Sequence, residues 1–261
     1  MYQWNPQDYS EHSANQEKWA HEVMGRLTLR GDERILDIGS GDGKVTAELV
    51  RRVPRGSVVG VDVSPEMVRF AQEKFPARNF PRLLFRQADA SALPFRDEFD
   101  WAVSFTCLHW VRDHVPVLEG VRRSLKPGGR VFLQFGGKGM ENVILEMSEP
   151  VMAAPRWSPY FSGFLFPWFF YDAEEYKPWV EKAGLTLRRV ELKSYEGVFT
   201  EQKLKGWVRS TWVPYTQRLP PSLREAFVSE VVGRCARKHA PDRHGVIRLV
   251  FKRLEVEAEK D

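Results

Sequence analysis

Short apolar runs alternate with amphipathic segments between about residues 34 and 135. The apolar runs predict five β-strands, at residues 34–39, 57–62, 82–89, 99–105 and 130–137. Segments 44–53, 64–75 and 115–125 place apolar side chains at helical spacing, and Ser64 followed by Pro65 is a strong helix start. Continuous apolar strands that alternate with helices predict an α/β protein whose parallel sheet is covered on both faces.

The second half of the chain has a different pattern. Residues 156–171 contain nine aromatic side chains in sixteen positions. They precede a predicted helix near 173–183, a strand at 185–192, helical segments from 201 to 239 and a last strand at 245–256. Because there is no internal repeat or low-complexity linker, we expect one domain over residues 1–261. Its core would be 20–137, with an N-terminal helix before it and cap segments at 138–183 and 200–240.

Composition narrows the possible partners. The chain of 261 residues is 43% hydrophobic and 28% charged, which is ordinary for a globular protein. Its net charge of +4 comes from 39 basic and 35 acidic residues, so no nucleic-acid partner is expected. Two distant cysteines argue against a disulfide framework and favour the cytoplasm. The N-terminus lacks an apolar signal region, and the aromatic run is too short and too broken by prolines to span a membrane.

A glycine-rich turn follows the first predicted strand and opens a helix. Asp37 precedes Gly39, Gly41 and Gly43, and glycines there let a ligand come close to the backbone. A dinucleotide site favours the spacing G-x-G-x-x-G, whereas this chain has Lys44 at the last place, which weakens that interpretation. The pattern resembles motif I of the class I S-adenosylmethionine (SAM) methyltransferases.

Three further features occur in the order expected of that family. Asp62 ends the second strand, where a carboxylate can accept both ribose hydroxyls. "QADASALPF" follows the third strand, and "LKPGGRVFL" precedes the fifth. The resemblance implies a Rossmann-like seven-stranded class I methyltransferase sheet with SAM as cofactor. The cofactor-binding residues that it implies are Asp37, Gly39, Ser40, Gly41, Asp62, Val63, Asp89, Ala90 and Ser104.

The stretch "SFTCLHW", residues 104–110, ends the fourth predicted strand. A metal site needs three or four ligands at workable spacing, and Cys107 with His109 has no second cluster, so we expect no metal. A nucleophilic Cys107 is unnecessary for direct methyl transfer, so Cys107 and Leu108 are expected in the core.

Trp110 is interpreted differently, because this stretch resembles the site of insect juvenile hormone acid methyltransferases and of plant carboxyl methyltransferases of the salicylate type. In those families a tryptophan indole N–H and an N-terminal glutamine hold the substrate carboxylate, and Gln16 matches that glutamine. "WNPQDY" and "RLVFKRL" are similar to trans-aconitate methyltransferase, but the arginine that this enzyme carries near the glutamine is absent, which argues against a polyacid. The resemblance implies transfer of a methyl group to the carboxylate of a small, mostly apolar acid (EC 2.1.1.-).

Several alternatives stay open. His109 is either structural, which we favour, or the general base for a phenol, hydroxyl or amine acceptor. The aromatic segment 156–171 is either core or the lining of an apolar pocket. A nucleic-acid or protein methyltransferase is disfavoured, since there is no concentrated basic stripe. A SAM-binding protein without catalysis is the remaining alternative, and the sequence names neither the acid nor the oligomeric state.

Overall fold

The computed structural model describes residues 2–261. Its strands are β1 (Arg34–Ile38), β2 (Ser57–Asp62), β3 (Leu83–Gln87), β4 (Phe99–Phe105), β5 (Leu125–Gly136), β6 (Thr186–Thr200) and β7 (Val246–Glu259). Its α-helices are α1 (Pro6–His12), α2 (Ala14–Met24), α3 (Lys44–Arg52), α4 (Pro65–Lys74), α5 (Val115–Ser124), α6 (Met140–Met152), α7 (Ala173–Lys182), α8 (Glu201–Thr211), α9 (Val213–Thr216) and α10 (Pro221–Lys238). Short 3-10 helices are η1 (Ala90–Ala92), η2 (Leu108–Trp110) and η3 (Ser158–Tyr160).

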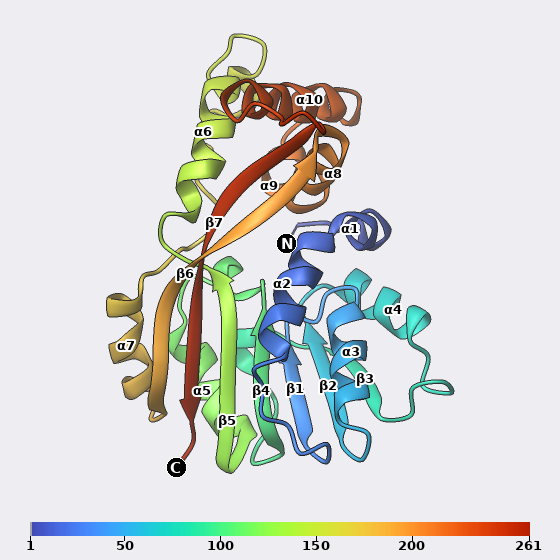
Figure 1. The fold of residues 1–261 in the computed structure, drawn as a ribbon, viewed down its shortest axis with the longest axis vertical. Coiled ribbons are helices and arrows are strands. Elements are labelled where there is room, and N and C mark those ends of the chain that lie inside the picture. Colours follow the sequence, from blue (N-terminus) through green and yellow to red (C-terminus); the bar gives the residue numbers. More distant parts are fainter. Residues whose placement is uncertain (1) are drawn as a thin grey trace. The chain divides into compact units, whose positions relative to one another are not determined.

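The seven strands form one sheet in the order β3-β2-β1-β4-β5-β7-β6 (Figure 1). Neighbours from β3 to β5 are parallel, whereas β7 is antiparallel to β5. The predicted seven-stranded Rossmann-like sheet is therefore confirmed, with a last strand that departs from the parallel pattern. The strand order reverses between β1 and β4, which is where open α/β sheets bind ligands.

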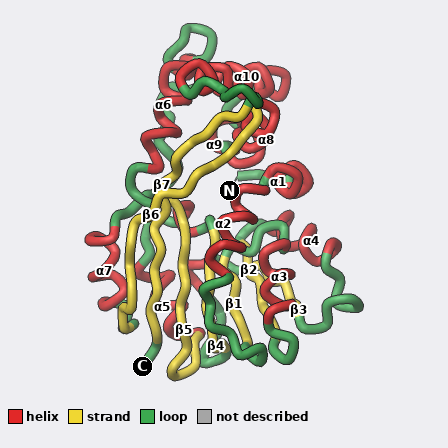
Figure 2. The backbone as a smooth tube through the Cα atoms, in the orientation of Figure 1, coloured by secondary structure: helices red, strands yellow, loops and turns green. Residues whose placement is uncertain are grey.

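Helices cover both faces of this sheet, as the alternating pattern predicts. One apolar cluster joins the sheet to α5 and α7, and a second joins it to α2, α3 and α4. Figure 2 shows the yellow strands between red helices. Helix α4 begins as its sequence predicts: the Ser64 hydroxyl accepts a hydrogen bond from the Met67 N–H, and Pro65 occupies the first turn.

The chain divides into two compact units. One unit comprises residues 16–138, 168–193 and 252–261, and we call it the sheet unit. The other comprises residues 1–15, 139–167 and 194–251, and we call it the helical unit. The expectation of a single domain with a core and two cap segments stays a prediction. The helix α7, expected in a cap segment, belongs to the sheet unit.

The helical unit contains α1, α6, α8, α9 and α10 around an aromatic core that includes Trp157, Phe161 and Phe227. Helix α6 was not predicted, although Ile144, Met147 and Val151 are buried at helical spacing along it. No helix among residues 2–261 is both long enough and apolar enough to cross a bilayer.

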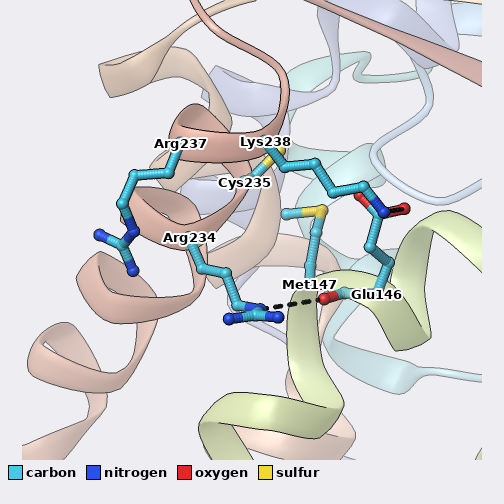
Figure 3. A pocket seen from close by; sticks show the side chains of 6 residues that line it. All are labelled: Glu146, Met147, Arg234, Cys235, Arg237 and Lys238. Carbon is cyan, nitrogen blue, oxygen red and sulfur yellow. Dashed lines mark hydrogen bonds and ion pairs between the residues drawn. The ribbon is translucent and has the colours of Figure 1, made fainter.

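Helix α6 contains Pro150, a residue type that normally interrupts helices, and a side chain of α10 compensates for it. Because proline has no N–H, the carbonyl oxygen of Glu146 lacks its helical donor. The Arg234 Nε of α10 donates to that oxygen instead, at 3.4 Å (Figure 3). The expected single N-terminal helix is likewise divided, into α1 and α2, at Ser13.

Candidate active site

Four loops of the sheet unit emerge at one edge of the sheet. The register pairs Ile38 with Val61 and Asp37 with Val103, so β1, β2 and β4 end side by side. The loops that follow β1, β2, β3 and β4 carry the glycine turn, Val63, Asp89 and Thr106, respectively. The predicted cofactor residues are thereby brought to the edge at which the strand order reverses.

The glycine turn is shaped by conformation and by close packing. Gly39, Gly41 and Gly43 have φ values of 78°, 52° and 80°, a left-handed region that favours glycine. A Cβ atom on Gly39 would lie 2.2 Å from the Cys107 Sγ. The turn after β1 therefore packs directly against the loop after β4, and only glycine fits at Gly39.

Two acidic side chains lie at the ends of β1 and β2. The Asp62 carboxylate accepts hydrogen bonds from the N–H groups of Gly41, at 3.0 Å, and Ser64, at 2.9 Å. Burial raises the pKa of Asp62 despite these bonds. Burial also raises the pKa of Asp37 to about 7, while the Thr46 hydroxyl, 2.7 Å away, opposes this rise. Asp62 thus links the glycine turn to the start of α4.

The Cys107 thiol lies among the three predicted acidic residues. Burial raises its pKa, and the negative charges of Asp62, Asp37 and Asp89 raise it further. A thiol in such surroundings stays protonated and is a poor nucleophile. Leu108 is fully buried as expected, whereas Cys107 is half-buried, so the expectation that both lie in the core is correct for Leu108 only. The three carboxylates share the neighbourhood of the Cys107 thiol.

Three other predicted cofactor residues differ in their surroundings. Ser40 is 7% exposed, and its hydroxyl has no hydrogen-bond partner among residues 2–261. Val63, which directly follows β2, is 41% exposed. The Ser104 hydroxyl is fully buried and donates to the Ile38 carbonyl at 2.7 Å, so it joins β4 to β1.

Asp89 and Ala90 lie where the third strand gives way to η1. The Asp89 carboxylate accepts hydrogen bonds from the N–H and the hydroxyl of Ser91, both through Oδ1. Asp89 is exposed and caps η1, and Ala90 is the first residue of that helix. The loop after β3 is thus stabilised by hydrogen bonds between its own residues, Asp89 and Ser91.

Trp110 lies in an aromatic cluster of the sheet unit. Its ring centroid is 5.4 Å from that of Trp168 and 5.9 Å from that of His109. The His109 ring is also 5.9 Å from Phe170. Trp168 and Phe170 thus pack near the end of β4, and Tyr171 packs on buried His114. Such a wall is suited to an apolar ligand.

His109 is held as a neutral ring. Removal from solvent and, to a smaller extent, the positive charge of Arg253 together lower the pKa of His109 to about 3. The His109 Nδ1 accepts from the N–H of Gly136 at 3.4 Å, so the proton of the neutral ring resides on Nε2. Accepting a second proton would break this bond, which favours the structural role of His109 over the role of a base.

Gln16 lies in α2 with only 7% of its surface exposed. Its Oε1 has no hydrogen-bond partner among the residues that the structure describes. Trp19, one turn further along α2, is buried at 2% exposure. A buried amide without a partner is unusual and requires an explanation, such as a ligand that completes its hydrogen bonds.

Two residues of the same region were not predicted from the sequence. Thr106 has a left-handed φ of 59°, and its hydroxyl accepts from Arg253 at 2.6 Å. Arg253 is 1% exposed, and its guanidinium lies 4.8 Å from the Trp19 ring. A sequence signal did exist, since Phe251, Arg253 and Glu255 occupy alternate positions of an apolar strand and all are buried.

A separate pocket of about 190 Å³ lies in the helical unit between α6 and α10 (Figure 3). Its lining residues are Glu146, Met147, Arg234, Cys235, Arg237 and Lys238. Lys238 pairs with the Glu146 carboxylate at 2.6 Å, and burial raises the pKa of Cys235 to about 11. The pocket contains none of the predicted site residues. Within residues 2–261, no group of three or more His, Cys, Asp or Glu side chains is arranged to hold a metal.

The strand order and the glycine turn define the class I methyltransferase fold, and comparisons with known proteins agree. A family model described as a methyltransferase domain matches residues 35–129. An uncharacterized methyltransferase of Schizosaccharomyces pombe is 31% identical over 195 residues, which are 72% of each chain. The trans-aconitate 2-methyltransferase of Methylobacterium nodulans is 26% identical over 260 residues, 97% of each chain.

Two further comparisons extend the agreement. The juvenile hormone acid O-methyltransferase of Drosophila melanogaster is 29% identical over 216 residues, 77% of this chain and 70% of that one. A solved structure of a candidate methyltransferase from Bacillus halodurans has a TM-score of 0.61 at 18% identity, covering 92% of this chain and 98% of that chain. The chain belongs to the class I SAM-dependent methyltransferases.

SAM is the cofactor of this class, and the residues present fit it. The glycine turn leaves the backbone open to a ligand, because three left-handed positions carry no side chain. The buried Ser40 hydroxyl beside it has no partner among residues 2–261, as expected of a group that a bound cofactor would satisfy. The exposed Val63 side chain offers an apolar contact at the end of β2.

Proposed function

We propose that the protein transfers a methyl group from SAM to the carboxylate of a small, mostly apolar acid. The observation that carries this proposal is Gln16, a buried amide whose Oε1 has no partner within residues 2–261. Rotating the amide by half a turn exchanges its oxygen and nitrogen, so the same side chain can present two N–H donors to a carboxylate. Trp110 adds an indole N–H from the wall of aromatic rings after β4.

Two relatives support an acid as the acceptor. The Methylobacterium and Drosophila relatives are named as methyltransferases of trans-aconitate and of juvenile hormone acid. The apolar wall of Trp110, Trp168 and Phe170 fits the more apolar of these two substrates. The acceptor that we propose is therefore a lipophilic carboxylic acid rather than a polyacid.

Cofactor binding is assigned to the edge of the sheet described above. Asp62 would accept from the ribose hydroxyls, since each of its oxygens keeps a lone pair beyond its bond to a backbone N–H. Val63 and the segment Asp89–Ala90 would contact the adenine. The full set that we assign to the cofactor is Asp37, Gly39, Ser40, Gly41, Asp62, Val63, Asp89, Ala90 and Ser104.

The chemistry that these residues would support needs no base. SAM supplies a methyl group on a sulfonium sulfur, and its transfer to a carboxylate oxygen breaks the C–S bond and forms a C–O bond, which yields an ester and a neutral thioether. A carboxylate with a pKa of about 4 is already ionised at neutral pH. Gln16 and Trp110 would orient it through neutral donors, and the aromatic wall would exclude water. The neutral His109 is consistent with this scheme.

The product class tests the proposal. The protein is incubated with methyl-labelled SAM and a panel of lipophilic acids, phenols and amines, and mild alkali is then applied to each labelled product. We expect labelled acids that release the label in alkali. Alkali-stable products would identify an ether or amine instead, with His109 as the base. Tight SAM binding without turnover on the whole panel would identify a SAM-binding protein without catalysis.

Two substitutions test the assignment of the acceptor site. Trp110→Phe keeps the aromatic wall but removes the N–H, and Gln16→Ala removes the amide. Each loss of a hydrogen bond to a charged group costs about 1.5–3 kcal/mol, so kcat/KM on the identified acid should fall roughly tenfold to a hundredfold. SAM affinity should be unchanged. Trp101→Phe, on the buried part of β4, is the matched control and should keep activity. Wild-type efficiency in both site variants would refute the assignment.

A further inference from the structure

Thr106 has a backbone conformation that its side chain does not favour. Its φ of 59° lies in the left-handed region, which β-branched residues rarely adopt. The Thr106 N–H donates to the Gln134 carbonyl of β5 at 2.7 Å. Thr106 directly follows β4 and is four positions before Trp110. The conformation of Thr106 therefore sets the direction in which the chain enters η2.

Arg253 is the side chain that contacts this position. Its Nη2 donates to the Thr106 hydroxyl at 2.6 Å and lies 3.5 Å from the Gln134 carbonyl. Its guanidinium also stacks over the Trp19 ring at 4.8 Å, an attractive arrangement for a buried cation. One guanidinium thus contacts both the loop that leads to Trp110 and the helix that carries Gln16.

Helix geometry strengthens the second link. Gln16 and Trp19 are three positions apart in α2 and so share one face of the helix. Both are buried, at 7% and 2% exposure. Arg253 therefore contacts the same face of α2 that carries Gln16.

We propose that Arg253 is a positioning residue of the acceptor site: it holds Thr106 in its left-handed conformation and thereby holds Trp110 in place relative to α2. This inference rests on the proposed function for its role in catalysis, but its structural part can be tested without any acceptor. The test depends on Thr106, because a residue that readily adopts a positive φ at position 106 would not need Arg253 to hold that conformation.

Four variants separate positioning from simple packing. Thr106→Val keeps the shape of the side chain but removes the oxygen that accepts from Arg253. Arg253→Gln removes the guanidinium. Thr106→Gly tolerates a positive φ without help, and the double variant Arg253→Gln/Thr106→Gly should therefore rescue Arg253→Gln. If Arg253 only filled space, glycine at position 106 would rescue nothing.

The first readout is the indole N–H resonance of Trp110 in ¹⁵N-tryptophan-labelled protein, assigned with Trp110→Phe. We expect this resonance to broaden or split in Thr106→Val and Arg253→Gln, and to return to a single sharp line in the double variant. The Trp157 indole, which donates to Glu230 at 2.8 Å in the helical unit, is the internal control and should stay unchanged. A sharp, single Trp110 line in both Thr106→Val and Arg253→Gln would overturn the proposal.

The second readout is turnover on the acid identified in the labelling experiment. Thr106→Val and Arg253→Gln should lower kcat about tenfold without changing SAM affinity, and the double variant should recover most of it. If Arg253→Gln does not fold, Thr106→Val and Thr106→Gly still carry the test, since only the first should lose turnover. Equal losses in both would overturn the inference. The resonances respond as expected even if no acid is methylated, so failure of the proposed function is recognised separately.

Discussion

At the scale of single residues, half-buried His109 and buried Asp37 have pKa values shifted in opposite directions. The pKa of His109, about 3, lies below its ordinary value of 6.5, so between these pH values the unfolded chain binds a proton that the folded chain does not. Stability from this group is lost as the pH falls through that window. The pKa of Asp37, raised from 3.8 to about 7, has the opposite effect, and stability from it is lost as the pH rises from 3.8 to 7.

His109→Gln should therefore change the pH dependence of stability in a defined direction. Between pH 7 and pH 5 the free energy of unfolding of the variant should fall about 1–2 kcal/mol less than that of the wild type. Urea denaturation at both pH values measures the difference. His21→Gln, at an exposed position of α2, is the matched control and should behave as the wild type. If the free energy of unfolding fell equally in the wild type and in His109→Gln between pH 7 and pH 5, His109 would be protonated in the folded chain at pH 5.

The residues at the edge of the sheet assigned to the cofactor could largely be predicted from the sequence, whereas the long-range contacts that hold them could not. The glycine turn, Asp62 and the strand-to-helix alternation are local patterns, readable over a few positions. The contact between Thr106 and Arg253 joins residues 147 positions apart, and no local pattern specifies it. The missed helix α6 shows a milder difficulty. Its apolar spacing was present, but Pro150 argues against a helix unless Arg234 is known to satisfy the freed carbonyl.

At the scale of elements, Asp62 connects three of them. It ends β2, accepts from Gly41 in the turn after β1 and accepts from Ser64 at the start of α4. Asp62→Ala would remove these bonds together with those assigned to the ribose. Because each hydrogen bond to a charged group is worth about 1.5–3 kcal/mol, SAM affinity should fall at least tenfold in calorimetry.

Asp100→Ala is the matched control for this prediction. Asp100 lies near the start of β4 and also accepts from a backbone N–H, that of Arg34, at 2.8 Å. It lies toward the opposite ends of the parallel strands, so its loss should leave SAM affinity unchanged. Unchanged affinity in folded Asp62→Ala would remove Asp62 from the cofactor site, and equal losses in the two variants would point to a general effect on the sheet.

At the scale of the whole molecule, the sheet unit is completed by residues far apart in the chain. The Glu255 carboxylate of β7 is fully buried and binds Arg26 at 2.7 Å, Gln134 at 3.1 Å, and Arg189 and Lys193 at 3.2 Å each. These partners come from the segment after α2 and from β5 and β6. One carboxylate thus joins the beginning, the middle and the end of the sequence.

Glu255→Gln should be strongly destabilising, because it leaves three cations around a neutral group. Breaking a buried ion pair costs about 3–5 kcal/mol, which should appear as a lower denaturation midpoint at an unchanged urea dependence. Glu257→Gln is the matched control, since Glu257 is more exposed and pairs with Arg189 alone among the cations named above. Its loss should cost less than about 1 kcal/mol. Similar midpoints for the two variants would mean that Glu255 is not a central anchor.

The antiparallel placement of β7 has a consequence for the order in which the protein is made. β5 ends at Gly136 and its partner β7 begins only at Val246. At synthesis rates of about 5–20 residues per second, the ribosome needs roughly 5–20 s to deliver that partner. Throughout this interval β5 is an open edge, with unpaired backbone groups that invite pairing with other chains. The nascent protein is therefore most exposed to aggregation while residues 137–245 are being translated, and a slow codon in this stretch would prolong that exposure.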